Sequence, residues 1–255
     1  MAEILTFLPG TMCDQRVWRP VRQRLEPRFS TDYIAIESEV TREGMLGLIH
    51  SAASVGDPLH LVAFSMGGYL ALEYALDNPG RVASLVTVAS SAFGLTEEEA
   101  VERVRALDLL AKHDYRGIPP ARINQFVHPS HQSDPDVVDV IRAMDRDLGK
   151  PVLVAQLKET STRVSLAPRL PELDIPLLLI GADSDPFVPF TAIERMAKLI
   201  PSATAIKARN AGHMIRWNSQ SGWPPALRNF RVEDQAALIV RSGDRIASTA
   251  SSVCA

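Results

Sequence analysis

A serine stands where an apolar run of the chain gives way to glycines. Residues 60–68 read HLVAFSMGG, so a pattern typical of a buried strand ends at Ser65, and Gly67 follows two residues later. A small-x-Ser-x-Gly pattern suits a sharp turn from a strand into a helix, which holds the serine in a strained backbone with its hydroxyl exposed. The alternative is an ordinary helix N-cap serine before a glycine-rich turn. Ser65 is therefore a candidate nucleophile.

A serine hydroxyl needs a base to remove its proton, and that base is usually a histidine oriented by a carboxylate. Among the six histidines, His213 lies in NAGHMI, directly after a predicted strand. We expect it in a loop at the carboxyl end of that strand, as Ser65 is. Of the other five, His60 falls within a predicted strand and His50 on a helix far from any strand end. The remaining three lie in a segment expected to form a lid: His113, His128 and His131. His213 is therefore the candidate base.

The candidate carboxylate lies in GADSDPFVP, residues 181–189, which also follows a predicted strand. Asp183 and Asp185 both qualify by position. Asp185 precedes Pro186 and lies four residues before Pro189, so a tight loop would fix its direction. Either aspartate could instead serve only to form the turn. The order along the chain is serine, aspartate, histidine.

Strand-length apolar runs alternate with helical patterns along most of the chain. The predicted strands are 3–8, 31–36, 58–64, 82–90, 175–181 and 203–208, and the predicted helices between them include 16–25, 67–79 and 190–201. Most of the strands lack strict polar alternation, which is typical of parallel strands covered on both faces. The pattern predicts an α/β protein with a doubly wound, mostly parallel sheet, whose ligands gather at the carboxyl ends of the strands.

One long segment, residues 91–173, contains no predicted strand. Helices are expected at 96–114, 134–148 and 150–160, the first with a start signal of Thr96 followed three residues later by Glu99. We expect residues 91–173 to form a helical cap, or lid, over the carboxyl edge of a core made of residues 1–90 and 174–255. The alternative is a helical excursion packed on the side. Two further helices are expected at 225–230 and 233–246.

The motifs AFSMGG, GADSDPFVP and AGHM, in this order, resemble those of the α/β-hydrolase fold superfamily, in particular serine esterases and lipases with a helical lid. The resemblance covers nearly the whole chain, to about Trp217. It implies that Asp185, rather than Asp183, is the acid of a triad with Ser65 and His213. Two departures are Ala63 in place of the usual glycine and, after Met214, the lack of the acidic-proline helix start found in many relatives.

The segment FLPGTMCDQRVW, residues 7–18, resembles the oxyanion loop of that superfamily, with Pro9 in place of the common histidine. By this resemblance the backbone N–H groups of Thr11 and Met66 would stabilise the oxyanion, and Met12 is the near alternative to Thr11. Loss of one such donor typically lowers the rate about 10²- to 10³-fold.

The expected activity is hydrolysis of a carboxylic ester with a small to medium acyl group, without metal or organic cofactor. Perhydrolases, carbon–carbon bond hydrolases, acyltransferases and hydroxynitrile lyases use the same triad, and a non-catalytic ligand-binding protein can share the fold. Five residues flank the catalytic positions and could contact substrate, although core packing is an equal alternative for each: Met12, Trp18, Phe64, Phe187 and Met214.

Composition excludes other classes of protein. The net charge is -3, the pI is about 6.1, and no long basic run occurs, so nucleic acid is not an expected partner. The two cysteines, Cys13 and Cys254, give neither a disulfide framework nor metal-ligand spacing. No apolar run has the length of a membrane span, and the first residues lack a secretory signal pattern. We expect a soluble cytoplasmic protein that does not bind membranes.

Overall fold

The computed structural model describes residues 4–26, 29–53 and 56–215. The two helices expected at 225–230 and 233–246 lie outside the described residues. Among the described residues, no helix is both long enough and apolar enough to cross a membrane.

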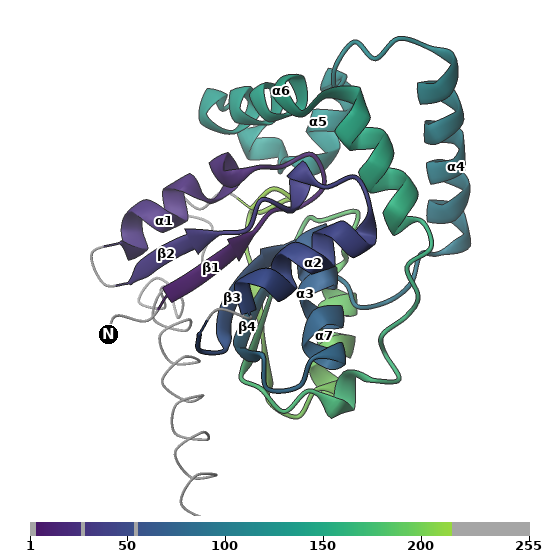
Figure 1. Cartoon of the computed structure of the whole chain (residues 1–255). Helices are drawn as coiled ribbons and strands as arrows, with labels where there is room; N and C mark the ends of the chain where they lie inside the picture. The colour runs from purple at the N-terminus through teal and green to yellow at the C-terminus, as the bar shows by residue number, and fades with distance from the viewer. Residues whose placement is uncertain (1–3, 27–28, 54–55, 216–255) are drawn as a thin grey trace, which may run out of the picture.

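Six parallel strands form one sheet in the order β2-β1-β3-β4-β5-β6 (Figure 1). This confirms the predicted α/β class with a parallel sheet. The strands are β1 (Ile4–Leu8), β2 (Ser30–Tyr33), β3 (Leu59–Phe64), β4 (Val82–Val88), β5 (Leu177–Ala182) and β6 (Ala203–Ala208). The order reverses between β1 and β3, where doubly wound sheets bind their ligands.

The strand expected at 31–36 is shorter than predicted. β2 ends at Tyr33, and the Ile36 N–H donates to Ile34 O at 2.9 Å, which turns the chain into a 3₁₀ helix, Ile36–Ser38. β2 is the edge strand, so only β1 pairs with it. The apolar residues Ile34 and Ile36 are therefore buried in the core, although they follow the end of the strand.

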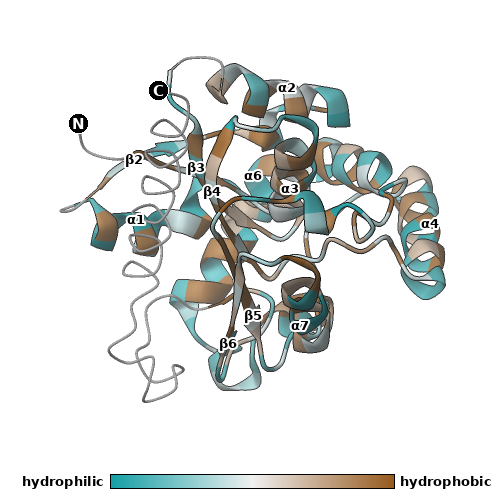
Figure 2. Cartoon of the chain, turned by 90° about the horizontal axis from the view of Figure 1, so that it is seen from below, coloured by the Kyte–Doolittle hydropathy of each residue, from teal (hydrophilic) through white to brown (hydrophobic). Residues whose placement is uncertain are grey.

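Successive side chains of the central strands enter two different cores. Leu61 and Ala63 of β3 pack on the side covered by α2 (Arg42–Ala53), α3 (Met66–Asp77) and α7 (Phe190–Leu199). Val62 and Phe64 pack on the opposite side, with α1 (Arg19–Leu25) and the 3₁₀ helix Gln15–Trp18. Figure 2 shows the hydrophobic colour concentrated on these strands. Burial on both faces explains why the strand sequences lack polar alternation.

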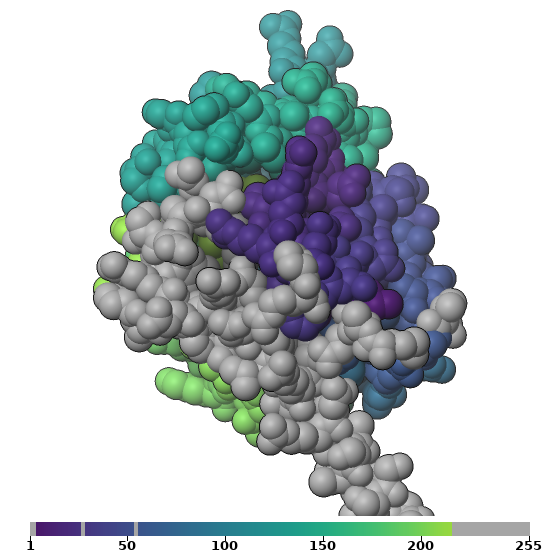
Figure 3. All heavy atoms as spheres, turned by 90° about the vertical axis from the view of Figure 1, so that its left-hand side faces the viewer, coloured from purple at the N-terminus to yellow at the C-terminus, as the bar shows by residue number. Residues whose placement is uncertain are grey.

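Residues 91–173, hereafter the helical insertion, connect β4 to β5. They contain α4 (Glu97–Lys112), α5 (Pro120–Phe126), α6 (Pro135–Thr160) and two 3₁₀ helices, Pro129–His131 and Leu170–Glu172, and no strand, as predicted. The two helices expected at 134–148 and 150–160 are both present within α6, where the non-helical backbone of Gly149 (φ 69°) separates them at a kink just before Pro151. In Figure 3 the insertion, in teal, lies across one end of the molecule against the N-terminal segment, in purple.

Candidate active site

Ser65 occupies the turn between β3 and α3 with an unusual backbone conformation, φ 49° and ψ -114°. A non-glycine residue in this region costs about 1–3 kcal/mol, so the surroundings must hold it there. They do so through the Ser65 N–H, which donates to Val88 O at 2.9 Å, and through Ser90 Oγ, which donates to Ser65 O at 2.8 Å. The Ser65 side chain does not cap α3. The hydroxyl is thus held for another partner, in contrast to the N-cap alternative.

The partner of the Ser65 hydroxyl is His213. The Ser65 Oγ atom lies 3.0 Å from His213 Nε2, and His213 Nδ1 lies 2.8 Å from Asp185 Oδ2. With its proton on Nδ1, the imidazole donates to the carboxylate and accepts from the hydroxyl. His213 and Asp185 are both buried, whereas Ser65 is half-buried. The structure therefore brings the three predicted residues together in one chain of hydrogen bonds.

The two candidate aspartates have different contacts. Asp185 Oδ1 accepts from the backbone N–H groups of Phe187 at 2.8 Å and Val188 at 3.0 Å, which leaves Oδ2 directed at the histidine. Asp183 accepts instead from the N–H groups of Asn210 and Ala211, at 2.9 and 3.1 Å. Asp183 thus fixes the loop that carries His213, while Asp185 contacts the imidazole itself.

The loop after β1 packs against the turn at Ser65. A Cβ atom on Gly67 would lie 2.4 Å from Pro9 O, so this position requires glycine because the loop passes so close. Next along the loop, Met12 has a positive φ of 54°, and its N–H donates to Gln156 Oε1 of the insertion at 2.8 Å. Since the N–H of Met12 is engaged, Thr11 is the better candidate of the two for an oxyanion donor. Thr11 is half-buried, and Met66 begins α3.

Three phenylalanine rings surround the imidazole of His213. The ring centroids of Phe64, Phe187 and Phe126 lie 5.2, 5.3 and 5.9 Å from it. Phe64 and Phe187 were predicted near the site, whereas Phe126 comes from α5 and has no sequence signal that would have placed it there. Trp18 packs 5.1 Å from the Phe7 ring, and its Nε1 donates to Leu8 O at 3.0 Å. These contacts place Trp18 in the core, which explains its position without a role in substrate binding.

The family model described as alpha/beta hydrolase fold matches residues 52–219, which is well over half of the protein. The matched range includes Ser65, Asp185 and His213. The protein belongs to the alpha/beta hydrolase fold family.

Relatives of this alpha/beta hydrolase have several activities. The pimeloyl-(acyl-carrier protein) methyl ester esterase of Neisseria meningitidis serogroup B is 26% identical over 184 residues, which are 70% of this chain and 71% of the esterase. A 2-hydroxy-6-oxononadienedioate/2-hydroxy-6-oxononatrienedioate hydrolase of Pseudomonas sp is 25% identical over 213 residues, 80% of this chain and 74% of that protein. The structure of a thermophilic esterase from Thermogutta terrifontis superposes with a TM-score of 0.75 at 22% identity, covering 95% and 91% of the two chains.

The insertion of this alpha/beta hydrolase contacts the histidine loop directly. The Met214 N–H donates to Phe126 O at 2.9 Å. A Cβ atom on Gly212 would lie 2.7 Å from both Phe126 O and the His128 N atom. Only glycine fits at position 212 without displacing the end of α5. Together with the bond between Met12 and Gln156, these contacts join the insertion to the loops that follow β1 and β6.

Neither a thiol nor a metal competes for the role of Ser65 in the described part of the chain. Burial raises the pKa of Cys13 to about 12, so its thiol stays protonated at neutral pH. Within residues 4–26, 29–53 and 56–215, no three His, Cys, Asp or Glu side chains are grouped to bind a metal ion.

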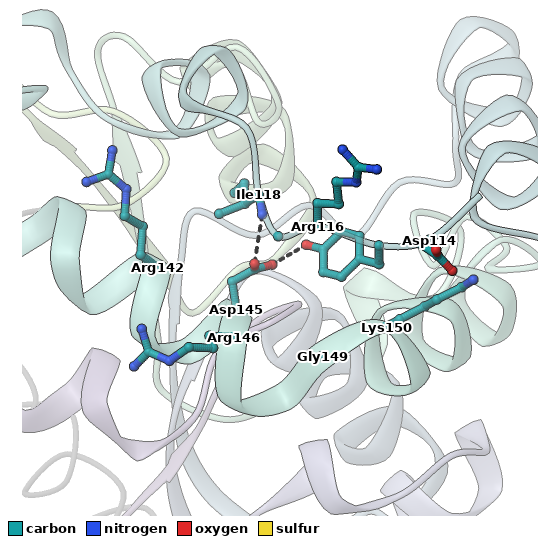
Figure 4. Close-up of a pocket in the computed structure, with 10 residues that line it drawn as sticks. Asp114, Arg116, Ile118, Arg142, Asp145, Arg146, Gly149 and Lys150 are labelled. Atoms are coloured by element: carbon teal, nitrogen blue, oxygen red, sulfur yellow. Dashed lines mark hydrogen bonds between the residues drawn. The ribbon is translucent and has the colours of Figure 1, made fainter.

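A cavity of about 720 Å³ lies within the insertion and includes none of the three hydrogen-bonded residues (Figure 4). Asp145 lies at its wall and accepts two hydrogen bonds, one from the Tyr115 hydroxyl and one from the Ile118 N–H at 2.7 Å. Four basic residues also line it: Arg116, Arg142, Arg146 and Lys150. The cavity is a cationic feature separate from the Ser65 centre.

Proposed function

We propose that this alpha/beta hydrolase is a serine hydrolase that cleaves carboxylic esters through an acyl-enzyme. The single observation that carries the proposal is the chain of hydrogen bonds from Ser65 through His213 to Asp185, held on a strained turn at the carboxyl edge of the sheet. This arrangement matches what nucleophilic catalysis by a serine requires.

In the proposed reaction, Ser65 Oγ attacks the ester carbonyl while His213 Nε2 takes the hydroxyl proton. Asp185 stabilises the resulting imidazolium and keeps the ring in the required tautomer. The N–H groups of Thr11 and Met66 bind the oxyanion of the tetrahedral intermediate. His213 then gives its proton to the leaving alkoxide, the ester bond breaks, and an alcohol departs. Water, deprotonated by His213, attacks the acyl-enzyme and releases the acid and the free serine.

We further propose that the helical insertion forms one wall of the acyl site. Its Phe126 lies beside the imidazole, and its Gln156 binds the loop that would supply the oxyanion donor. Met12, Phe187 and Met214 are half-buried around this region and are the remaining candidates for substrate contact. A site lined by phenylalanine rings favours acyl groups with apolar carbon chains.

Ester hydrolysis is supported by the similarity to the methyl ester esterase, and a hydrolase of some kind by every relative described above. Carbon–carbon bond hydrolysis is the second candidate, favoured by the 25% identity to the 2-hydroxy-6-oxononadienedioate hydrolase. The same triad suits both reactions because both pass through a tetrahedral intermediate at a carbonyl carbon. Perhydrolysis, acyl transfer and cyanohydrin cleavage use the same groups with a different acceptor or bond.

The test is hydrolysis of p-nitrophenyl esters of rising acyl length by wild type and Ser65→Ala in parallel. The proposal expects turnover by wild type, an optimum of chain length, and loss of nearly all turnover in the variant. Equal residual rates in both proteins would show that Ser65 is not the nucleophile. If folded wild-type protein hydrolyses no ester but cleaves a vinylogous 1,5-diketone, the second candidate replaces the first. A protein that binds but turns over neither is a ligand-binding member of the family.

A further inference from the structure

Three arginines of the helical insertion lie beside the proposed active centre. They are Arg103 in α4, Arg122 in α5 and Arg163, three residues after the end of α6. Arg122 is the one nearest to the imidazole. Its Cζ lies 4.7 Å from the centroid of Phe187 and 4.9 Å from that of Phe126, and both rings contact His213. One aromatic ring therefore separates this guanidinium from the candidate base.

Arg103 is connected to the same centre through α6. Its Nη1 donates to Thr160 Oγ1 at 2.7 Å, and Thr160 Oγ1 donates to Gln156 O at 2.6 Å. The side chain of Gln156 in turn binds the Met12 N–H of the candidate oxyanion loop. Positions 156 and 160 are one helical turn apart, so Gln156 and Thr160 share one side of α6. Arg163 follows in the segment just after the helix.

The positive charge of these three arginines is only partly offset, by the nearby carboxylates of Glu99 and Glu102. Among the described residues, no carboxylate forms an ion pair with any of them. The nearest acids are Glu99, which accepts from the Thr96 N–H in the capping box of α4, and Glu102. Burial lowers the pKa of all three guanidinium groups, and Arg163 and Arg122 also lower that of Arg103 by repulsion.

Two buried donors at this place lack an acceptor. The Nε of Arg163 and the Nε2 of Gln156 are both buried without a hydrogen-bond partner, and Gln156 is 0% exposed. Leu157 O, near the end of α6, accepts weakly from Arg103 Nη1 at 3.4 Å, and Gln125 Oε1 accepts from Arg122 Nη1 at 2.7 Å. The Nε of Arg163 has no such acceptor. Unpaired buried donors and grouped like charges both cost free energy unless an anion binds to them.

We propose that Arg103, Arg122 and Arg163 bind an oxyanionic group of the substrate, a carboxylate or a phosphate, at the end remote from the ester. Planar guanidinium groups pair well with the oxygens of either anion. The inference rests on the proposed function, because it takes Ser65 as the place where the ester is cleaved. It assigns the substrate to the class of acyl esters with an anionic terminus.

The first test compares matched esters. Mono-p-nitrophenyl esters of straight-chain dicarboxylic acids, from adipate to sebacate, are paired with neutral p-nitrophenyl esters of the same carbon number. The proposal expects kcat/KM to favour the dicarboxylate member about 10- to 100-fold at one chain length. It also expects the preference to fall as sodium chloride is added. Equal kcat/KM for both members at every length would overturn the proposal.

The second test assigns the preference to the arginines. Arg122→Gln and Arg163→Gln are each expected to reduce the preference about tenfold, mainly by raising KM for the dicarboxylate ester. Arg116→Gln, which removes a cation from the cavity of Figure 4, is the matched control and is expected to leave the preference unchanged. Arg122 as a whole residue is exposed, although its guanidinium packs against the rings of Phe126 and Phe187, so its variant keeps the test valid if Arg163→Gln fails to fold. An equal loss in Arg116→Gln would contradict the assignment.

The third test is independent of turnover. Calorimetric titration of the wild-type protein with adipate, and separately with inorganic phosphate, measures whether the arginines bind an anion and which one they prefer. Binding of either, weakened about tenfold by Arg122→Gln, supports the site even if no ester is hydrolysed. Absence of binding by both anions, in protein that does hydrolyse neutral esters, overturns the anion site and leaves the proposed function standing.

Discussion

The two sides of the site are built in different ways. On the side of the sheet, Ser65, Asp185 and His213 follow strand ends, and their directions are fixed by backbone hydrogen bonds to Val88, Phe187 and Val188. On the side of the insertion, the side chains near the site come from separate helices, such as Phe126 of α5 and Gln156 of α6. In the proposed function, the sheet fixes the geometry needed to cleave a bond, and the insertion supplies charge and shape for the substrate. The following variants separate these two contributions.

Loss of the base should have the largest effect. His213→Ala is expected to lower kcat for a p-nitrophenyl ester about 10⁴-fold or more, because the serine then has no proton acceptor. His113→Ala, at an exposed position of the insertion, is the matched control and should retain full activity. Steady-state kinetics of the two variants measure this. Retention of more than a few per cent of the rate in His213→Ala would mean that another group is the base.

The second largest effect should be the difference in kcat between substitutions of the two aspartates. Asp185→Asn is expected to lower kcat about 10²- to 10⁴-fold, because an amide stabilises neither the imidazolium nor its tautomer. Asp183→Asn keeps one acceptor for the Asn210 and Ala211 N–H groups and should cost about 1–2 kcal/mol of unfolding free energy with a smaller loss of rate. Kinetics and urea unfolding of both variants test this. The reverse ranking in kcat would assign the acid to Asp183.

Gly212→Ala tests the contact between the two sides. The added Cβ would collide with Phe126 O and the His128 N atom, so the end of α5 or the histidine loop must move. We expect a loss of about 1–3 kcal/mol in stability and about a tenfold fall in kcat. Gly47→Ala, where a Cβ has open space within α2, should instead be neutral or stabilising. Unchanged kinetics in Gly212→Ala would show that the insertion does not constrain His213.

Gln156→Met should have the smallest effect. It removes the acceptor for the Met12 N–H while keeping the volume of the side chain, so the candidate oxyanion loop loses one anchor. We expect kcat to fall about 3- to 10-fold with little change in KM. Glu159→Ala removes a different bond from the same helix, to the Arg42 N–H at 3.2 Å, and serves as the control. Equal losses in both would indicate a general loosening of α6.

The sequence predicted the sheet side of the site because each of its parts has a local cause. A strand end, a small residue, a serine and a glycine suffice to specify the turn at Ser65, and the loop of Asp185 is fixed by its own prolines and N–H groups. The position of the two aspartates in the sequence left Asp183 and Asp185 open, and only the resemblance to a family favoured Asp185. The choice depends on which carboxylate meets the histidine, and for Asp185 that histidine is 28 positions away. That information lies in the packing of β5 against β6.

The contributions of the insertion were not predictable in the same way. Phe126, Gln156 and the three arginines carry no motif, and an amphipathic helix pattern does not say what its polar face will meet. The expected helix at 150–160 does place Gln156 and Thr160 on one side, but it does not predict what that side meets. The placement of the insertion's residues thus depends on tertiary packing, whereas the residues of the hydrogen-bonded chain follow from local sequence.

The most direct measurement is the intact mass of the protein after reaction with a p-nitrophenyl alkylphosphonate, followed by peptide mapping. A phosphonate is attacked like an ester carbonyl and leaves a stable adduct on the attacking oxygen. The account predicts one adduct per chain, located at Ser65, absent from Ser65→Ala and formed far more slowly by His213→Ala. An adduct on another residue, or equal labelling of Ser65→Ala, would contradict the assignment of the nucleophile.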